Sequence, residues 1–385
     1  MFLEAGARVV KTALDDYRAL TRQDWFRYSP ILGWEKLPNF KGIAAREYRE
    51  FDSEGNILRA KQGSGRSTQT VLLLGDSCTY GLNVPYESTF GALLDEKLDG
   101  VSIKNLATPG YSSYQGLQLL KQVIASRPAL IIASFSFNDR RPVVNEKSMD
   151  GEAHFQFMST WSWVLGPMSL SYPFKGLHSL FIKEVDLREM PVRVPLDAYR
   201  SNLEEMGRIS TKYGVPIMFL VLEDNPIFMS HIEQGLELVN QGQPNQAIKK
   251  FKESAVLHPL ASELPKLFLA RTYEALGKVD EANRTGRIVP QPRYDGGANP
   301  LRLDSQYAQT MIGVAEKLGV TWFDARPFLD EDPSVFFDLV HFDEEGHKKI
   351  ADGLYEFIVK QGLLNLEPSL TKLREPAKLS STAGV

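Results

Sequence analysis

The sequence predicts an α/β fold in which helices cover both faces of a parallel sheet. From Val71 onward, short apolar runs alternate with amphipathic segments, and the apolar runs carry no polar alternation. Strands that are apolar on both faces are typical of parallel sheets buried between two helical layers. At 385 residues the chain has room for one large domain with an inserted segment, or for two domains.

The composition is that of a soluble globular protein, with 43% hydrophobic and 24% charged residues. A net charge of -4 gives no basic surface for nucleic acid. The single cysteine, Cys78, excludes an internal disulfide framework and leaves the compartment open. No apolar run reaches about 18 residues, so we expect no transmembrane segment. The N-terminus lacks the charged and apolar blocks of a secretory signal.

Residues 1–66 are expected to form a helix followed by a small β-rich preamble. Apolar residues recur at helical spacing over 1–22, which fits a packing helix or a helix on a membrane surface. Over 25–65, aromatics, prolines and glycines punctuate short segments. This part is expected to accompany the main domain and not to fold independently. At the other end of the chain, residues 366–385 are expected to form a flexible tail.

The main α/β domain is expected over 67–230 and 289–365. Its strands are predicted at 71–75, 101–105, 129–135, 215–222 and 320–324. Its helices are predicted at 88–98, 113–126, 196–213, 307–318 and 346–361. Ser77, Gly110 and Asn138 each follow a strand by a few residues. Because ligand sites in parallel sheets form outside the carboxyl ends of the strands, these residues are expected to converge on one edge.

Residues 231–288 interrupt the alternation of strands and helices. Small residues recur there at an offset of 35 positions, in the pairs Gly235/Ala270, Gly242/Gly277 and Ala247/Ala282. Small residues let paired helices approach closely, and the middle pair is expected to occupy turns. The spacing resembles that of the tetratricopeptide (TPR) repeat, a helix–turn–helix unit with a period of about 34 residues; an unrelated helical insert is the alternative. Two repeats rarely form a stable solenoid, so we expect packing on the parent domain and a surface for a protein partner.

A serine and a histidine in suitable contexts predict nucleophilic chemistry. Ser77 follows the apolar run that ends at Gly75, so its hydroxyl is expected at the mouth of the sheet. A serine needs a positioned base to take its proton. Among the 6 histidines of the chain, His341 stands three residues after Asp338, so a carboxylate and an imidazole arrive on one loop. These residues predict a serine hydrolase.

Four sequence blocks, taken together, resemble those of the SGNH hydrolases, the GDSL esterase/lipase superfamily. In chain order they are Gly75-Asp76-Ser77 with Thr79 and Gly81, Asn105-Leu106-Ala107-Thr108-Pro109-Gly110-Tyr111-Ser112-Ser113, Asn138-Asp139, and Asp338-Leu339-Val340-His341. The resemblance covers roughly 71–223 and 302–362 and implies a flavodoxin-like three-layer α/β/α domain. Two positions depart from the family pattern: Phe137 replaces a glycine and Phe342 replaces a proline.

The resemblance also implies a role for each matching residue. Ser77 would be the nucleophile, His341 the general base, and Asp338 the group that orients His341. The oxyanion hole would consist of the backbone N–H groups of Ser77 and Gly110 and the side-chain amide of Asn138. No cofactor is implied, and no cluster of residues has metal-ligand spacing.

Neighbouring polar residues are expected to have other roles. Asp76 is expected to brace the turn by hydrogen bonding, and Asp139 to cap a helix or to bind near the substrate. His347 is expected to help a helix begin. The side chain of Cys78 is expected to point away from the site.

Three functions remain open on the sequence. The first is an esterase or deacetylase that acts on a carboxylic ester, such as an O-acylated glycan or lipid. The second is an acyltransferase that uses the same triad to modify a sugar hydroxyl, and the third is a TPR scaffold with vestigial catalysis. Residues 28–39 resemble segments that precede the catalytic domain in bacterial SGNH proteins, which favours an extracytoplasmic location. A cytoplasmic location stays open because the chain carries no signal or anchor.

Overall fold

The computed structural model describes most of the chain between residues 25 and 366. The described residues are 25–44, 46–58, 69–143, 146, 149–156, 185–186, 188–222, 224–257, 263–288, 306–330, 333–336 and 338–366. The helix expected over 1–22 lies outside them, as does all but the first residue of the expected tail over 366–385.

The centre of the fold is a five-stranded parallel sheet with the strand order β11-β9-β7-β5-β6. The strands are β5 (Gln69–Gly75), β6 (Val101–Asn105), β7 (Leu130–Ser134), β9 (Ile217–Val221) and β11 (Thr321–Asp324). This is the flavodoxin-like order, so the predicted fold class is confirmed. The chain leaves β5 toward β6 on one side, and β7 lies on the other side. In sheets of this order, ligands bind at the carboxyl ends of the strands where the order reverses, which is here beside β5.

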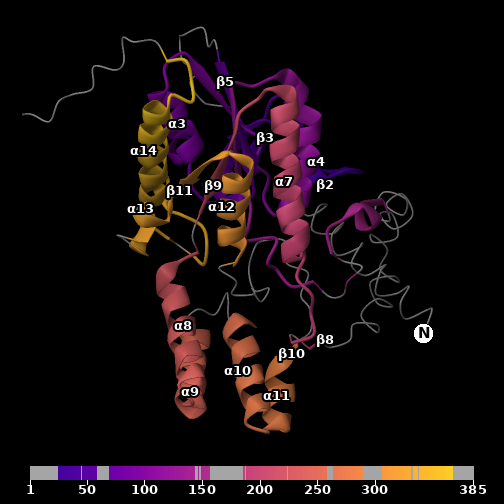
Figure 1. The fold of residues 1–385 in the computed structure, drawn as a ribbon, viewed down its shortest axis with the longest axis vertical. Coiled ribbons are helices and arrows are strands. Elements are labelled where there is room, and N and C mark those ends of the chain that lie inside the picture. The colour runs from indigo at the N-terminus through magenta and orange to yellow at the C-terminus, as the bar shows by residue number, and fades with distance from the viewer. Residues whose placement is uncertain are drawn as a thin grey trace, which may run out of the picture.

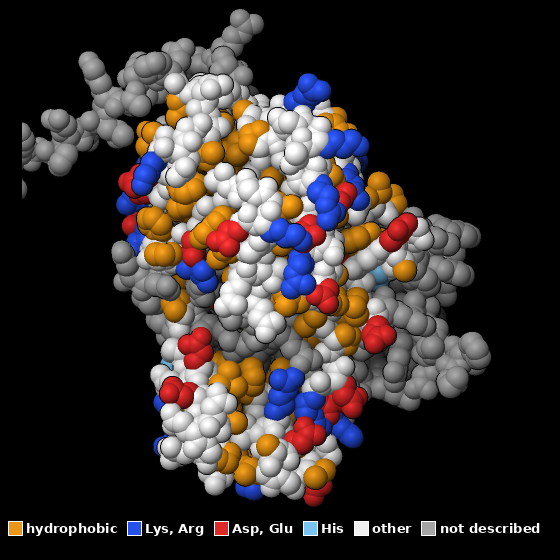
Figure 2. All heavy atoms as spheres, in the orientation of Figure 1, with side chains coloured by type: hydrophobic (Ala, Val, Ile, Leu, Met, Phe, Trp, Pro, Cys, Tyr) orange, Lys and Arg blue, Asp and Glu red, His pale blue; other side chains and the backbone are white. Residues whose placement is uncertain are grey.

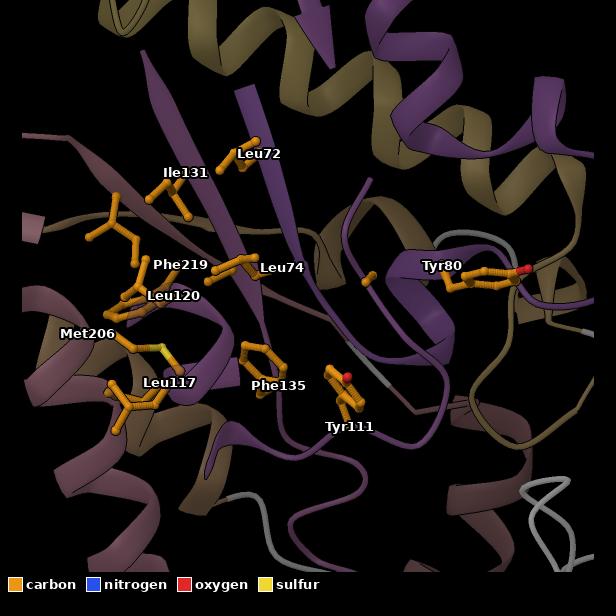
Figure 3. Packing of buried hydrophobic residues seen from close by; sticks show 14 of the residues in the cluster. Leu72, Leu74, Tyr80, Tyr111, Leu117, Leu120, Ile131, Phe135, Met206 and Phe219 are labelled. Carbon is orange, nitrogen blue, oxygen red and sulfur yellow. The ribbon is translucent and has the colours of Figure 1, made fainter. Parts of the chain in front are cut away.

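Helices cover both faces of this sheet (Figure 1). On one face lie α3 (Phe90–Lys97) and α14 (Glu344–Gln361), and on the other lie α4 (Ser113–Val123), α7 (Leu196–Tyr213) and α12 (Gln306–Leu318). Alternate residues of β5 enter the two cores. Val71 and Leu73 pack with α3 and α14, whereas Leu72 and Leu74 pack on the side of α4 and α7 (Figure 3). This two-sided burial explains why β5 has no polar alternation.

Two β-hairpins precede the sheet and form the expected β-rich preamble. They consist of β1 (Phe26–Ser29) with β2 (Gly33–Lys36), and β3 (Lys41–Ala44) with β4 (Glu47–Glu50). Two buried basic side chains dock them on the main domain. Arg49 Nη2 donates to the carbonyl oxygen of Val84 at 2.6 Å, and Lys36 Nζ donates to that of Ala107 at 2.8 Å. Burial lowers the pKa of Lys36 to about 7.

Four successive helices lie beyond one end of the sheet (Figure 1). They are α8 (Pro226–Asn240), α9 (Pro244–Leu257), α10 (Glu263–Ala275) and α11 (Val279–Gly286), so helical structure begins before residue 231. Gly242 (φ +71°) and Gly277 (φ +69°) lie in the turns after α8 and α10. A Cβ at Gly235 would lie 2.3 Å from the ring of Phe251, so α8 and α9 approach closely there. That these pairs are TPR units binding a protein partner stays a prediction.

Two surface properties bear on what the protein can contact. No helix in the described part of the chain has the length and apolar content needed to cross a membrane. On the face in Figure 2, basic and acidic side chains are interspersed over both the sheet domain and the helices below it. That face therefore has no extended field of one sign.

Two helical glycines differ in the space around them. A Cβ at Gly116 of α4 would lie 2.1 Å from Cζ of Phe135, a side chain only 2% exposed. We expect Gly116→Ala to lower the free energy of unfolding by about 1–3 kcal/mol, because overpacking outweighs the gain in helix propensity. Urea unfolding measures this change. Gly313→Ala in α12, with nothing within 4 Å, is the matched control. It should raise the free energy of unfolding by about 0.5–1 kcal/mol, and equal effects would contradict the prediction.

Candidate active site

The turn after β5 places Ser77 at the first residue of the short helix α2 (Ser77–Tyr80). A Cβ on Gly75 would lie 2.3 Å from Oγ1 of Thr79 and 3.0 Å from the carbonyl oxygen of Ser134, so only glycine fits. Asp76 is the N-cap of α2, and its Oδ1 accepts the N–H of Cys78 at 2.9 Å. As expected, Asp76 braces the turn. The backbone N–H of Ser77 has no hydrogen-bond partner among the described residues.

The structure brings Ser77, His341 and Asp338 into one chain of hydrogen bonds. Nε2 of His341 lies 2.8 Å from Oγ of Ser77, and Nδ1 of His341 lies 2.7 Å from Oδ2 of Asp338. Because an ionised carboxylate can only accept, the proton of a neutral His341 belongs on Nδ1. Nε2 is then the acceptor for the hydroxyl of Ser77. Ser77 and His341 are buried, with 7% and 4% exposed.

The carboxylate of Asp338 is held by its own loop. Burial acts to raise the pKa of Asp338, but its hydrogen bond with His341 and the backbone N–H groups of Val340 and His341 hold the pKa below the ordinary value. These two N–H groups donate to Oδ1 at 2.9 and 2.8 Å. Asp338 is therefore ionised near neutral pH, in the form that holds a protonated Nδ1.

Asn138 follows β7 and is linked to the serine turn through Asp76. Its Nδ2 donates to Oδ2 of Asp76 at 3.0 Å, and its Oδ1 accepts from Arg141 at 3.4 Å. A carboxamide carries two N–H donors, so this arrangement leaves one available. Burial of Asp76 raises its pKa, and the side chain of Asn138 is one of the donors that oppose this shift.

Gly110 lies on the loop after β6, beside the end of β5. The N–H of Thr108 donates to the carbonyl oxygen of Gly75 at 3.0 Å, which anchors this loop next to the serine turn. Gly110 has φ +84°, a conformation that favours glycine, and its N–H has no partner among the described residues. All five predicted site residues thus lie at the carboxyl edge of the sheet or on the loop that faces it.

The neighbouring Asp139 and His347 serve helix ends. Oδ1 of Asp139 accepts the N–H of Ser113, the first residue of α4, at 2.9 Å. His347 lies within α14 and accepts the N–H of Phe90 at 3.3 Å, so it serves the start of α3. The helix in which His347 lies begins instead at its N-cap Asp343. His347 therefore helps a helix begin, as expected, and that helix is α3.

Cys78 is turned away from the reacting groups. Its Sγ lies 3.3 Å from the carbonyl oxygen of Val340, to which it donates, and burial raises its pKa well above the ordinary value. The thiolate, which is the reactive form, is thereby disfavoured. In the described part of the chain, no group of three or more His, Cys, Asp or Glu side chains is arranged to hold a metal ion.

Sequence reasoning missed the contacts of two residues, Asp224 and Asn225, that directly precede the helical segment. Arg140 and Asp224 form an ion pair in which Nη2 of Arg140 lies 2.7 and 2.8 Å from the two carboxylate oxygens, with side chains 8% and 11% exposed. The next residue, Asn225, donates its backbone N–H to the carbonyl oxygen of Leu339 at 2.7 Å and its side chain to that of Asp338 at 3.0 Å. The segment that begins α8 therefore braces the loop of Asp338. Only the apolar run before Asp224 hinted at this position.

Comparisons with known proteins find similarity among solved structures. No protein-family model and no curated protein matches the chain. Similar structures include a lipolytic G-D-S-L family member from Veillonella parvula (TM-score 0.38, 11% identity, 76% of this chain and 98% of that one). They also include a lipase/acylhydrolase from Enterococcus faecalis (TM-score 0.38, 14% identity, 78% of this chain and 98% of that one). An acetylxylan esterase from Geobacillus stearothermophilus is similar as well (TM-score 0.37, 13% identity, 78% of this chain and 98% of that one).

The buried carboxyl of Asp139 makes a pH-dependent contribution to stability. Burial raises its pKa to about 7, whereas the unfolded value is about 3.9. Between these values the folded protein holds a proton that the unfolded chain releases, so the contribution of Asp139 to stability falls as pH rises from about 4 to 7. Asp139→Asn should remove this dependence on pH, because an amide does not titrate. The free energy of unfolding of the variant should therefore rise relative to that of wild type as pH increases from about 4 to 7. Urea unfolding at several pH values measures it, and parallel curves would contradict it.

Proposed function

We propose that the protein is a serine esterase that cleaves carboxylic esters through an acyl-enzyme intermediate. The observation that carries the proposal is the hydrogen-bonded series Ser77–His341–Asp338, with distances of 2.8 and 2.7 Å. Nucleophile, base and orienting carboxylate are within the reach that proton transfer needs, before any substrate is bound.

In the acylation step, His341 takes the hydroxyl proton of Ser77 on Nε2 while Oγ attacks the ester carbonyl. The imidazolium that forms is stabilised by Asp338, which accepts the Nδ1–H. The tetrahedral intermediate then collapses: the bond to the alcohol oxygen breaks, and that oxygen takes the proton from Nε2. Ser77 is left as an ester of the acyl group.

The negative charge on the attacked oxygen needs donors that are already in place. The backbone N–H groups of Ser77 and Gly110 and the second N–H of Asn138 are the candidates, and none of these three has a partner among the described residues. Each preorganised donor of this kind is worth about 2.7–4 kcal/mol of transition-state stabilisation.

In the deacylation step, His341 takes a proton from water, whose oxygen attacks the acyl carbon. Collapse of the second intermediate returns the proton to Oγ of Ser77 and releases the acid. A sugar hydroxyl could take the place of this water, which would make the protein an O-acyltransferase. O-acylated glycans or lipids are the substrates that we propose for either reaction.

Product analysis separates hydrolysis from transfer. With p-nitrophenyl acetate as acyl donor and a sugar acceptor present, we expect free acetate to be the main product, because water is in large molar excess over the sugar. Mass spectrometry of the sugar fraction measures the competing transfer. Acetylated sugar formed faster than acetate would overturn the esterase assignment in favour of the transferase.

Replacement of the nucleophile tests the proposal directly. Ser77→Ala should lower kcat for p-nitrophenyl acetate by about 10⁴-fold or more, because the acyl-enzyme cannot form. Labelling with a fluorophosphonate probe should disappear in the same variant. Ser88→Ala is the matched control, since Ser88 is a half-buried serine that donates to Glu344 at 2.6 Å. Retained labelling in Ser77→Ala would remove the assignment of the nucleophile.

A further inference from the structure

The peptide bond that joins Pro109 to Gly110 has a hydrogen bond on its carbonyl side. Nε1 of Trp34 donates to the carbonyl oxygen of Pro109 at 3.1 Å, in a buried setting where Trp34 is 8% exposed. The other end of the same peptide unit is the N–H of Gly110, a proposed oxyanion donor. Trp34 belongs to β2 of the N-terminal hairpin, outside the four sequence blocks.

The geometry of a peptide links these two ends. The described chain contains no cis peptide bond, so the C=O of Pro109 and the N–H of Gly110 point in opposite directions in one plane. A donor that holds the oxygen therefore sets the direction of the N–H. Rotation of this peptide would leave the buried indole N–H of Trp34 without its partner, which is costly.

The indole is itself held in place. The hydroxyl of Tyr111 donates to the carbonyl oxygen of Trp34 at 2.6 Å, and the two rings pack edge to face with centroids 5.7 Å apart. A Cβ at Gly110 would lie 3.1 Å from Cζ2 of Trp34, so the ring lies close against the Cα of this glycine. Position 110 thus requires glycine for its space as well as for its positive φ.

The next peptide is held from another segment of the chain. Nη1 of Arg193 donates to the carbonyl oxygen of Gly110 at 2.6 Å, and the guanidinium lies 5.6 Å from the centroid of the Trp34 ring. The N–H of Tyr111 donates to the carbonyl oxygen of Thr108 at 3.1 Å. Both peptides that flank the Cα of Gly110 therefore have fixed orientations.

We infer that Trp34 is a positioning residue for the oxyanion hole. By donating to the oxygen of the Pro109–Gly110 peptide, its indole orients the N–H of Gly110. It also polarises the peptide, which strengthens that N–H as a donor. The inference rests on the proposed function, and it makes the N-terminal hairpin a working part of the site.

Trp34→Phe removes the indole N–H and keeps an aromatic ring. We expect kcat for p-nitrophenyl acetate to fall about tenfold. Complete removal of one oxyanion donor lowers kcat by about 10²- to 10³-fold, and the loss here is smaller because the N–H of Gly110 is still present and only its orientation is less well fixed. KM should stay within about twofold, because the donor acts mainly on the transition state. Steady-state kinetics of the full chain measure both values.

Trp25→Phe is the matched control. Trp25 is another buried tryptophan that precedes the sheet, 4% exposed, and it packs on Phe26, Phe51 and Tyr80. The same substitution there should lower the thermal midpoint without lowering kcat. If Trp25→Phe lowers kcat as much as Trp34→Phe does, or if Trp34→Phe leaves kcat unchanged, the role of Trp34 is only structural and the inference is wrong.

A second variant covers the case in which Trp34→Phe does not fold. Tyr111→Phe removes the hydrogen bond that holds the backbone of Trp34, so the indole is held less firmly against the carbonyl oxygen of Pro109 and kcat should fall by a few-fold. An unchanged kcat would overturn the inference. An inactive wild type, indistinguishable from Ser77→Ala, would overturn the proposed function and this inference with it. An active wild type with an unaffected Trp34→Phe would overturn the inference alone.

Discussion

The buried carboxylate of Asp76 holds the candidate site together. One of its oxygens accepts the N–H of Cys78 and sets the turn that presents Ser77, and the other accepts the amide of Asn138. Asp76 thereby ties the end of β5 to the segment after β7, across the point where the strand order reverses. Burial raises the pKa of Asp76, and these donors oppose that shift because they favour the ionised form.

Segments outside the sheet then close around this edge. Asn225, which leads into α8, donates to the carbonyl oxygens of Asp338 and Leu339. At the other end of the helical segment, β10 (Arg287–Ile288) pairs with β8 (Val185–Asp186). Arg193, a few residues after β8, donates to the carbonyl oxygen of Gly110. The helical segment is therefore attached at both of its ends to segments that contact the site.

The fold could be predicted because its signals are local. Apolar runs without alternation mark each strand of a doubly covered sheet, and the helix at 196–213 coincides with α7 (Leu196–Tyr213). The site residues could be selected because short blocks carry them, although Ser77 and His341 are 264 positions apart. The bond from Trp34 to Pro109 spans 75 positions and that from Arg193 to Gly110 spans 83, and neither leaves a periodic or spacing signal. Contacts of this kind are visible only in three dimensions.

The loop after β6 explains why such contacts are needed. An N–H that is to receive an oxyanion must stay free of protein acceptors, while the carbonyl groups of the same buried loop must be satisfied. Donors from outside the sheet meet this need: Lys36 binds the carbonyls of Asn105 and Ala107, Trp34 binds that of Pro109, and Arg193 binds that of Gly110. Trp34 and Lys36 are two residues apart on β2, so they face the loop from one side of the strand. The hairpin thus satisfies the acceptors of the loop and leaves the N–H of Gly110 available for substrate.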